Sequence, residues 1–139
     1  MKCKGYLLDT NICAFYLRGK FQVDQMIDHA GWEHCYISEI TALELKFGAE
    51  LSKQRDGIDR NPQLNDFLEA IRILPITGAL DFAAQEKIRL RLLGTPANDN
   101  FDLLIACTSV VNDLVMVTDN TMDFKNILDI QLENWIVRK

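Results

Sequence analysis

Short apolar runs alternate with longer segments of helical periodicity along most of this chain. The runs at 3–8, 35–37, 73–76 and 114–118 predict strands, and a looser alternation at 130–137 predicts a final one. Helical segments separate these runs, so each strand must return to the sheet by a crossover rather than a hairpin. The alternation therefore predicts an α/β fold, a three-layer sandwich around a central, mostly parallel sheet of four to five strands.

Residues that favour helix ends bound the helical segments. Ser38 is expected to cap a long helix, and Gly94 is expected to close another. The stretch 57–62 interrupts the helical pattern. Pro75 is expected at an edge of the sheet because it has no backbone N–H for a neighbouring strand. The expected helices are 12–17, 22–30, 39–55, 64–71, 80–93 and 101–112.

Length and composition are those of an ordinary globular protein. The 139 residues fit one domain, residues 1–139, with 48% hydrophobic and 25% charged residues. No run approaches the roughly 20 apolar residues that span a bilayer, and the apolar run before Asp9 is too short for a secretory signal. We therefore expect a cytoplasmic protein without membrane association.

The cysteine positions favour buried thiols over a metal site. No C-x-x-C pair occurs, and each cysteine lies in or beside an apolar segment. A zinc site at His29, His34 and Cys35 would lack a fourth ligand and the usual spacing. The four cysteines are Cys3, Cys13, Cys35 and Cys107.

The formal net charge of −5 excludes a protein whose whole surface binds phosphates. A role with nucleic acid would need cations that gather locally. Such a cluster is, by itself, more often a solvated face. The candidate clusters are Arg18 with Lys20, Lys46 with Lys53 and Arg55, and Lys87 with Arg89 and Arg91.

Two aspartates directly follow apolar strands. Asp9 follows the first strand, and Asp119 follows Thr118 at the end of the strand at 114–118. In a parallel sheet both lie at the carboxyl edge, where α/β folds bind their ligands. Each also suits the cap of a helix that follows its strand, so capping and function stay open for both.

Glu44 interrupts an apolar stripe on the expected helix 39–55. Burying an ionised carboxylate is costly unless a cation or hydrogen-bond donors compensate it, so one interpretation is a cation-facing Glu44. The other is a capping box, Thr41-x-x-Glu44, in a helix that begins later. The expected buried stripe is Ile40, Glu44, Phe47 and Leu51, flanked by Leu43.

Asp102 lies in the first turn of a helix, where the helix dipole favours a negative charge. It shares a face with Ile105, Ala106 and Ser109, so it also points toward the sheet. Asp99, in the polar loop before this helix, is expected to be solvated.

Carboxylates that converge repel one another, and a hard divalent cation with oxygen ligands is the usual resolution. Asp9, Glu44 and Asp102 therefore predict a Mg²⁺ site. Mg²⁺ binds through few carboxylates, keeps several waters and joins substrate phosphates. This chemistry favours phosphodiester cleavage by a metal-activated water.

Five short stretches, taken in their order and spacing, cover nearly the entire chain and match one family. They are Leu7-Leu8-Asp9-Thr10-Asn11-Ile12; residues 38–48 with Ala42-Leu43-Glu44-Leu45-Lys46-Phe47-Gly48; Gly94-Thr95-Pro96 leading to Asp102-Leu103-Leu104-Ile105-Ala106; Val117-Thr118-Asp119-Asn120 with Asp123-Phe124; and Glu133-Asn134-Trp135. In these stretches the chain resembles the PIN-domain ribonucleases, and specifically the VapC toxins of bacterial toxin–antitoxin pairs.

The resemblance implies a parallel sheet flanked by helices and a Mg²⁺- or Mn²⁺-dependent endoribonuclease. Asp9, Glu44 and Asp102 match the metal acids of the family, and Thr118 matches a hydroxyl residue that supports the site. VapC toxins commonly cut structured RNA, either tRNA or a ribosomal RNA loop, and a VapB-like antitoxin holds them inactive. An RNA substrate, a cognate antitoxin and a second copy of the chain in a homodimer are thus the implied partners.

One position departs from the family pattern. The fourth acid usually stands two residues after the threonine, where this chain has Asn120, while Asp119 lies one residue early. We take Asn120 as the positional match and keep Asp119 as its substitute. The missing acid leaves open an alternative, a catalytically inactive PIN-like module that binds RNA or protein.

Two other aspartate-based α/β classes are disfavoured. Phosphatases of the haloacid dehalogenase type need Asp-x-Asp after the first strand, where this chain has Asp9-Thr10-Asn11. Receiver domains of response regulators need an acidic pair before the phosphorylated aspartate, and residues 1–8 contain no acid.

Overall fold

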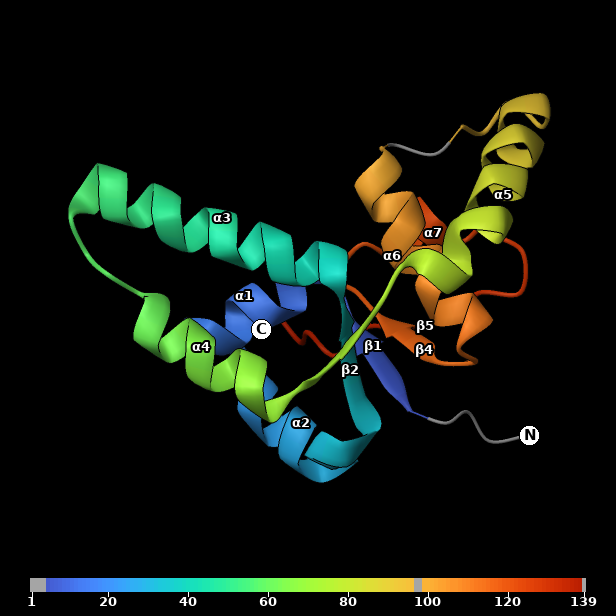
Figure 1. The fold of residues 1–139 in the computed structure, drawn as a ribbon. Coiled ribbons are helices and arrows are strands. Elements are labelled where there is room, and N and C mark those ends of the chain that lie inside the picture. The colour runs from blue at the N-terminus through green and yellow to red at the C-terminus, as the bar shows by residue number, and fades with distance from the viewer. Residues whose placement is uncertain (1–4, 97–98, 139) are drawn as a thin grey trace.

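Five parallel strands form the centre of the fold (Figure 1). The structure, a computed structural model, describes residues 5–96 and 99–138. The expected sheet of four to five mostly parallel strands is confirmed, and every pairing in it is parallel. The strands are β1 (Tyr6–Leu8), β2 (Cys35–Ser38), β3 (Arg72–Leu74), β4 (Val115–Val117) and β5 (Gln131–Glu133), in the spatial order β3-β2-β1-β4-β5.

Helices cover both faces of this sheet. Leu7 and Leu8 are both fully buried on the central strand β1, and their side chains belong to two separate core clusters because successive residues of a strand point to opposite faces. The three-layer expectation is thereby confirmed. The α-helices are α1 (Thr10–Leu17), α2 (Val23–Ala30), α3 (Glu39–Asp56), α4 (Asn61–Ala70), α5 (Leu80–Leu92), α6 (Asn100–Val111) and α7 (Thr121–Phe124), with 3-10 turns at Trp32–His34 and Thr77–Ala79.

Two central strands pass directly into helices. Asp9 caps α1 after β1, and its side chain accepts a hydrogen bond from the backbone N of Thr10. Ser38 caps α3 after β2, as expected, and its Oγ accepts from the backbone N of Ile40 at 3.1 Å. These tight connections place the residues that follow β1 and β2 at the same edge of the sheet.

Several element bounds differ from expectation. Within the described residues the first strand covers Tyr6–Leu8, and positions 3 and 4 of the expected strand lie outside them. β3 lies at an edge of the sheet, as expected, but it covers Arg72–Leu74, so Pro75 follows the strand instead of lying within it. The last strand ends at Glu133 rather than 137, because Trp135 and Ile136 turn into the core. The one-turn helix α7 was not expected.

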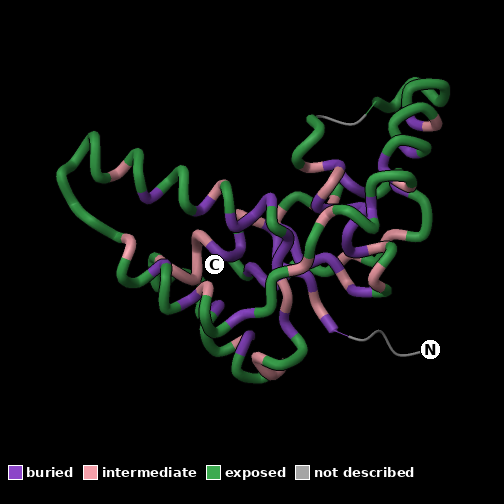
Figure 2. The backbone as a smooth tube through the Cα atoms, viewed as in Figure 1, coloured by how far each residue is buried: buried purple, intermediate pink, exposed green. Residues whose placement is uncertain are grey.

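The expected buried stripe on α3 is wrong. Phe47 is 66% exposed, and Leu43 and Leu51 are also exposed, although Ile40 is buried. The buried face instead carries Thr41, Ala42, Leu45 and Ala49, through which α3 packs against α1 and α4. Small alanines let the helices approach closely but give a weak hydrophobic signal. The outer half of α3 lies away from the sheet and is mostly exposed (Figure 2).

Cys13, Cys35 and Cys107 are buried and free, as expected, and Cys3 lies outside the described residues. Burial raises the pKa of Cys35 to about 11 and that of Cys107 to about 12, so both thiols stay protonated at neutral pH. Among the described helices, none has the length and apolar character that a membrane crossing requires.

Candidate active site

The carboxyl edge of the sheet collects polar side chains from β1, β4 and the helices that follow. Asp9 extends β1 and its backbone N donates to the carbonyl of Val117 at 2.9 Å. Thr118 follows β4, and its Oγ1 donates to Oδ2 of Asp9 at 2.8 Å. Residues 109 positions apart are thus joined, as the parallel arrangement predicts.

Asp9 caps α1, which confirms the capping interpretation, and its carboxylate also faces this edge, where its functional role stays a prediction. Its side chain is buried, with Oδ1 accepting from the backbone N of Thr10 and Oδ2 from Thr118. Burial raises the pKa of Asp9 above its usual value, and these two hydrogen bonds oppose that rise. The nearby charges of Glu44 and Asp99 raise the pKa further.

Glu44 reaches the same edge from α3. It is half-buried, and its Oε1 accepts from Oγ1 of Thr10 at 2.6 Å. The Thr10 hydroxyl also meets that of Thr41 at 3.0 Å. The capping-box interpretation is wrong, because α3 begins at Glu39 with Ser38 as its cap. The contact between Thr10 and Glu44 was not predicted, because no local sequence pattern links residues 34 positions apart.

Asp102 lies in the first turn of α6 and is half-buried. The buried face of this helix carries Ile105, Ala106 and Ser109. Desolvation raises its pKa to about 6, and the charges of neighbouring acids add to the rise. Asp99 is exposed, as expected, and it also caps α6 by accepting from the backbone N of Asp102 at 2.7 Å.

Asp119 and Asn120 have different surroundings. The Asp119 carboxylate accepts two hydrogen bonds from Arg138, at 2.7 and 2.6 Å, and one from Asn134 at 3.3 Å. Its pKa is lowered, chiefly by Arg138. Asn120 is exposed, and its backbone N donates to Oγ1 of Thr118 at 3.1 Å. Asp119 is therefore already neutralised, whereas the side chain of Asn120 is exposed beside the turn that carries Thr118.

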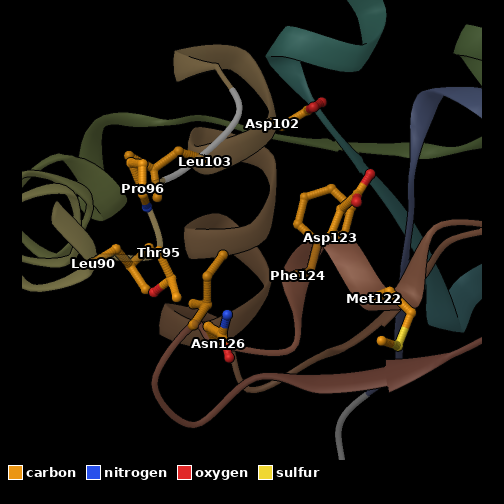
Figure 3. A pocket seen from close by; sticks show the side chains of 10 residues that line it. Leu90, Thr95, Pro96, Asp102, Leu103, Met122, Asp123, Phe124 and Asn126 are labelled. Atoms are coloured by element: carbon orange, nitrogen blue, oxygen red, sulfur yellow. The ribbon is translucent and has the colours of Figure 1, made fainter. Parts of the chain in front are cut away.

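A further acid, Asp123, lines a pocket of about 180 Å³ together with Asp102 (Figure 3). In that view the carboxylates of both residues lie on the same side of the pocket. Asp123 comes from α7, which the hydrophobic pattern did not predict. It belongs to a matching stretch of sequence, but its position beside Asp102 was not predicted, because one turn of helix has no periodicity to detect.

The donor set suits a hard divalent ion that keeps its own waters. Asp9, Glu44 and Asp102 lie close enough for the charges of Asp9 and Glu44 to raise the pKa of Asp102. None of the three pairs with a lysine, arginine or histidine within residues 5–96 and 99–138. No three acid, histidine or cysteine side chains of this described part close into a ready metal cage. Mg²⁺ needs no such cage, because it binds through one or two carboxylates and several waters.

Beside this edge runs a groove of about 440 Å³ between α1, α3 and α4. Thr10 and Glu44 line it, and so do three arginines, Arg18, Arg55 and Arg60. The groove joins parts of two cation clusters that lie far apart in the sequence. Its apolar lining comes from Ala14, Leu17, Leu45, Ala49 and Leu64.

Comparison with known proteins identifies a family to which this chain belongs. The PIN domain family profile matches residues 6–128. The chain is 31% identical over 132 residues to the tRNA(fMet)-specific endonuclease VapC of Salmonella typhimurium, covering 94% of this chain and 97% of that one. It is 30% identical over 135 residues to ribonuclease VapC2 of Rickettsia felis, covering 94% and 97%.

Solved structures agree with these relatives. DNA-bound VapBC from Salmonella typhimurium matches with a TM-score of 0.82 and 30% identity, covering 94% of this chain and 98% of that one. VapBC2 from Rickettsia felis, bound to a DNA fragment of its promoter, matches with a TM-score of 0.82 and 27% identity, covering 94% and 98%.

Proposed function

Since this chain belongs to the PIN domain family, and its relatives are VapC ribonucleases, we propose that it is a toxin endoribonuclease that cuts RNA at the carboxyl edge of its sheet. The observation that carries the proposal is that Asp9, Glu44 and Asp102 lie near one another and that none of them has a basic partner among residues 5–96 and 99–138. Ionised together, these acids repel one another. A divalent cation would make their proximity favourable, and it would also attract the anionic phosphodiester to this edge.

We propose Mg²⁺, with Mn²⁺ as a substitute, as the ion that Asp9, Glu44 and Asp102 hold. When bound, the ion would lower the pKa of a water for attack on phosphorus and offset the charge of the phosphate. Thr118 keeps the Asp9 carboxylate in one orientation, and Thr10 does the same for Glu44.

Structured RNA, with tRNA first, is the proposed substrate, and the cytoplasm is the proposed place of action. The support is the name of the Salmonella relative, an endonuclease specific for tRNA(fMet). The chain itself offers Arg18, Arg55 and Arg60 beside the acids, on a molecule whose net charge is −5. Such local cations are what a phosphate backbone requires of an acidic protein.

A VapB-like antitoxin is the proposed protein partner, because the matching structures are VapBC complexes. The groove between α1, α3 and α4 suits a segment of such a partner, since its apolar lining and its arginines complement an amphipathic, acidic peptide. A segment lying there would reach Glu44 and cover the acids.

A homodimer is the proposed assembly. Large apolar side chains are exposed on α3, at the end of α5 and directly after it, among them Phe47, Leu92 and Leu93. Exposed apolar groups of this size are typical of surfaces that another chain covers. Light scattering of the purified chain should give twice the mass of one copy.

The alternative function is binding without cleavage, and Asn120 is the observation that favours it, because the fourth acid is absent there. It predicts a chain that binds RNA equally well with and without a chelator and never shortens it. Under the nuclease proposal Asp123 supplies a fourth carboxylate close to Asp102, so the lack of an acid at Asn120 does not prevent cleavage.

Cleavage of bulk bacterial tRNA by the purified chain, freed of any antitoxin, tests the proposal. We expect cutting with Mg²⁺ or Mn²⁺ and none in EDTA. Asp9→Asn and Asp102→Asn should each lower the rate about a thousandfold, because each removes a charge that holds the ion. Asp81→Asn is the matched control, an exposed acid in the first turn of α5, and should cut normally. Full activity of Asp9→Asn or Asp102→Asn would refute the site.

A further inference from the structure

The turn after β4, residues 118–120, is fixed from two sides. On its inner side the Thr118 hydroxyl donates to Asp9 at 2.8 Å and accepts from the backbone N of Asn120 at 3.1 Å. On its outer side the Asp119 carboxylate accepts from both terminal nitrogens of Arg138, at 2.7 and 2.6 Å. One short turn therefore links the buried metal acid Asp9 to an arginine in the C-terminal segment.

Arg138 is itself held in place. Its guanidinium carbon lies 5.2 Å from the centre of the Phe21 ring, and Phe21 packs edge-on against Phe15 at 4.8 Å. The chain before Arg138 is anchored by buried Trp135, whose ring lies 5.4 Å from that of Tyr6 on β1. A planar guanidinium stacked on a ring and forked onto a carboxylate is a directional contact, which the point charge of a lysine does not reproduce.

The pair contributes more to geometry than to stability. The Arg138 side chain is 57% exposed, and exposed ion pairs add little to the free energy of unfolding. Asp119 is only 15% exposed, and Asn134 also donates to it. The amide of Asn134 is oriented in turn, because its Oδ1 accepts from the backbone N of Ile136 at 2.8 Å. Arg138 and Asn134, both held in defined orientations, thus fix the outer side of the turn by donating to Asp119.

We propose that Arg138 is a positioning residue of the nuclease site. By holding Asp119 it keeps the turn in the conformation in which Thr118 reaches Asp9, and it keeps the Asp119 charge from joining acids that already repel one another. The proposal rests on the proposed function. Arg138 touches neither substrate nor metal, so its effect passes through Asp119 and Thr118.

The test is a double-mutant cycle with two readouts, Mn²⁺ binding followed by electron paramagnetic resonance and cleavage of bulk tRNA. Arg138→Gln should weaken Mn²⁺ binding and lower kcat about tenfold, as for other residues that orient a metal ligand, with little change in KM. Asp119→Asn should have a similar effect. The double variant should be no worse than either single one, because both disrupt the same pair. Arg138→Lys should recover only part of the loss.

The matched control is Arg72→Gln. Arg72 also lies over an aromatic ring, 5.8 Å from the centre of Tyr36, but it stands at the start of the edge strand β3. It should leave Mn²⁺ binding and cleavage unchanged. In the metal-free protein, the backbone amide NMR signals of Thr118 and Asn120 should shift in Arg138→Gln and stay in place in Arg72→Gln.

Three results would overturn the proposal. They are Mn²⁺ affinity of Arg138→Gln within twofold of the original chain, multiplied losses in the double variant, and tighter Mn²⁺ binding by Arg138→Gln, which would mean that a freed Asp119 joins the metal. An original chain that binds Mn²⁺ but never cuts RNA would refute the proposed function alone, and the Mn²⁺ and NMR measurements would still decide the role of Arg138. A chain that neither binds nor cuts would refute both.

Discussion

Two acids on neighbouring helices of this chain have opposite environments. Glu86 on α5 is 2% exposed, and its carboxylate accepts two hydrogen bonds from Arg89 at 2.8 Å and one from the backbone N of Leu128 at 3.0 Å. Its pKa is lowered, chiefly by Arg89. Asp102 on α6, which packs against α5, has its pKa raised to about 6 by burial and by other acids.

The difference separates an acid whose charge is compensated within the chain from one whose charge is not. Glu86 finds every partner within the chain, so its charge joins α5 to the segment before β5. Asp102 has no ion pair among the described residues, and burial and the nearby acids disfavour its ionised form. A strongly perturbed acid without a basic partner is a candidate for a functional site, on electrostatic grounds that burial alone does not give.

The largest expected effect is a loss of stability on removing Glu86, the acid whose charge is compensated within the chain. Glu86→Ala should lower the free energy of unfolding by about 2 kcal/mol, because it removes three hydrogen bonds and leaves the Leu128 N–H without its acceptor. Urea unfolding measures this loss. The folded fraction should still cut tRNA at the original rate. A variant as stable as the original, or one that stays folded but does not cut, would contradict the contrast.

A smaller effect, on the rate of cleavage, is expected on removing the hydroxyl of Thr10 that donates to Glu44. Thr10→Val should lower cleavage about tenfold, because Glu44 loses the donor at 2.6 Å that fixes its carboxylate. Thr10→Ser, which keeps the hydroxyl, should cut nearly as fast as the original chain. The cleavage rates of both variants are measured at saturating Mg²⁺. Equal rates for Thr10→Val and Thr10→Ser would exclude a role for the hydroxyl.

The smallest effect is in the pH dependence of stability without metal. The folded chain binds the Asp102 proton more tightly than the unfolded chain, since the pKa is raised from 3.8 to about 6. This stabilisation is therefore present at low pH and is lost as pH rises from about 4 to 6. It amounts to about 1 kcal/mol once solvent screening of a half-buried group is allowed for.

Asp102→Asn sharpens the same comparison. In EDTA, urea unfolding at pH 4.5 and 7.5 should show a smaller loss of stability for this variant than for the original chain. Glu86→Gln should change the pH dependence in the opposite direction, because its carboxyl pKa is lowered in the folded state. Identical profiles for the original chain and Asp102→Asn would mean that the acid is ordinarily solvated.

The edge at which the acids meet could be predicted from the sequence. Parallel strands bring their carboxyl ends together, so the residue after each strand is placed by topology, as Asp9 and Thr118 are. Asp102 was placed by helical periodicity, which correctly found the buried face of α6. Glu44 was placed at the right edge for a wrong reason, since the face expected to bury it carries exposed Phe47 and Leu51.

Side-chain partners between distant segments could not be predicted. Thr10 meets Glu44 across 34 residues, and Arg138 meets Asp119 across 19, because neighbouring elements happen to bring them within reach. Periodicity gives a direction for each side chain on its own element. It gives no distance between elements, so the hydroxyls and the arginine that orient the acids stayed invisible.

The central place of β1 in the sheet has a consequence for timing. Residues 6–9 leave the ribosome early, whereas their neighbours at 115–118 follow more than a hundred positions later. Until then the first acid has no hydroxyl to fix it, and the third has barely been made. The proposed nuclease edge is therefore assembled only after residue 118 has been synthesised and β4 has paired with β1.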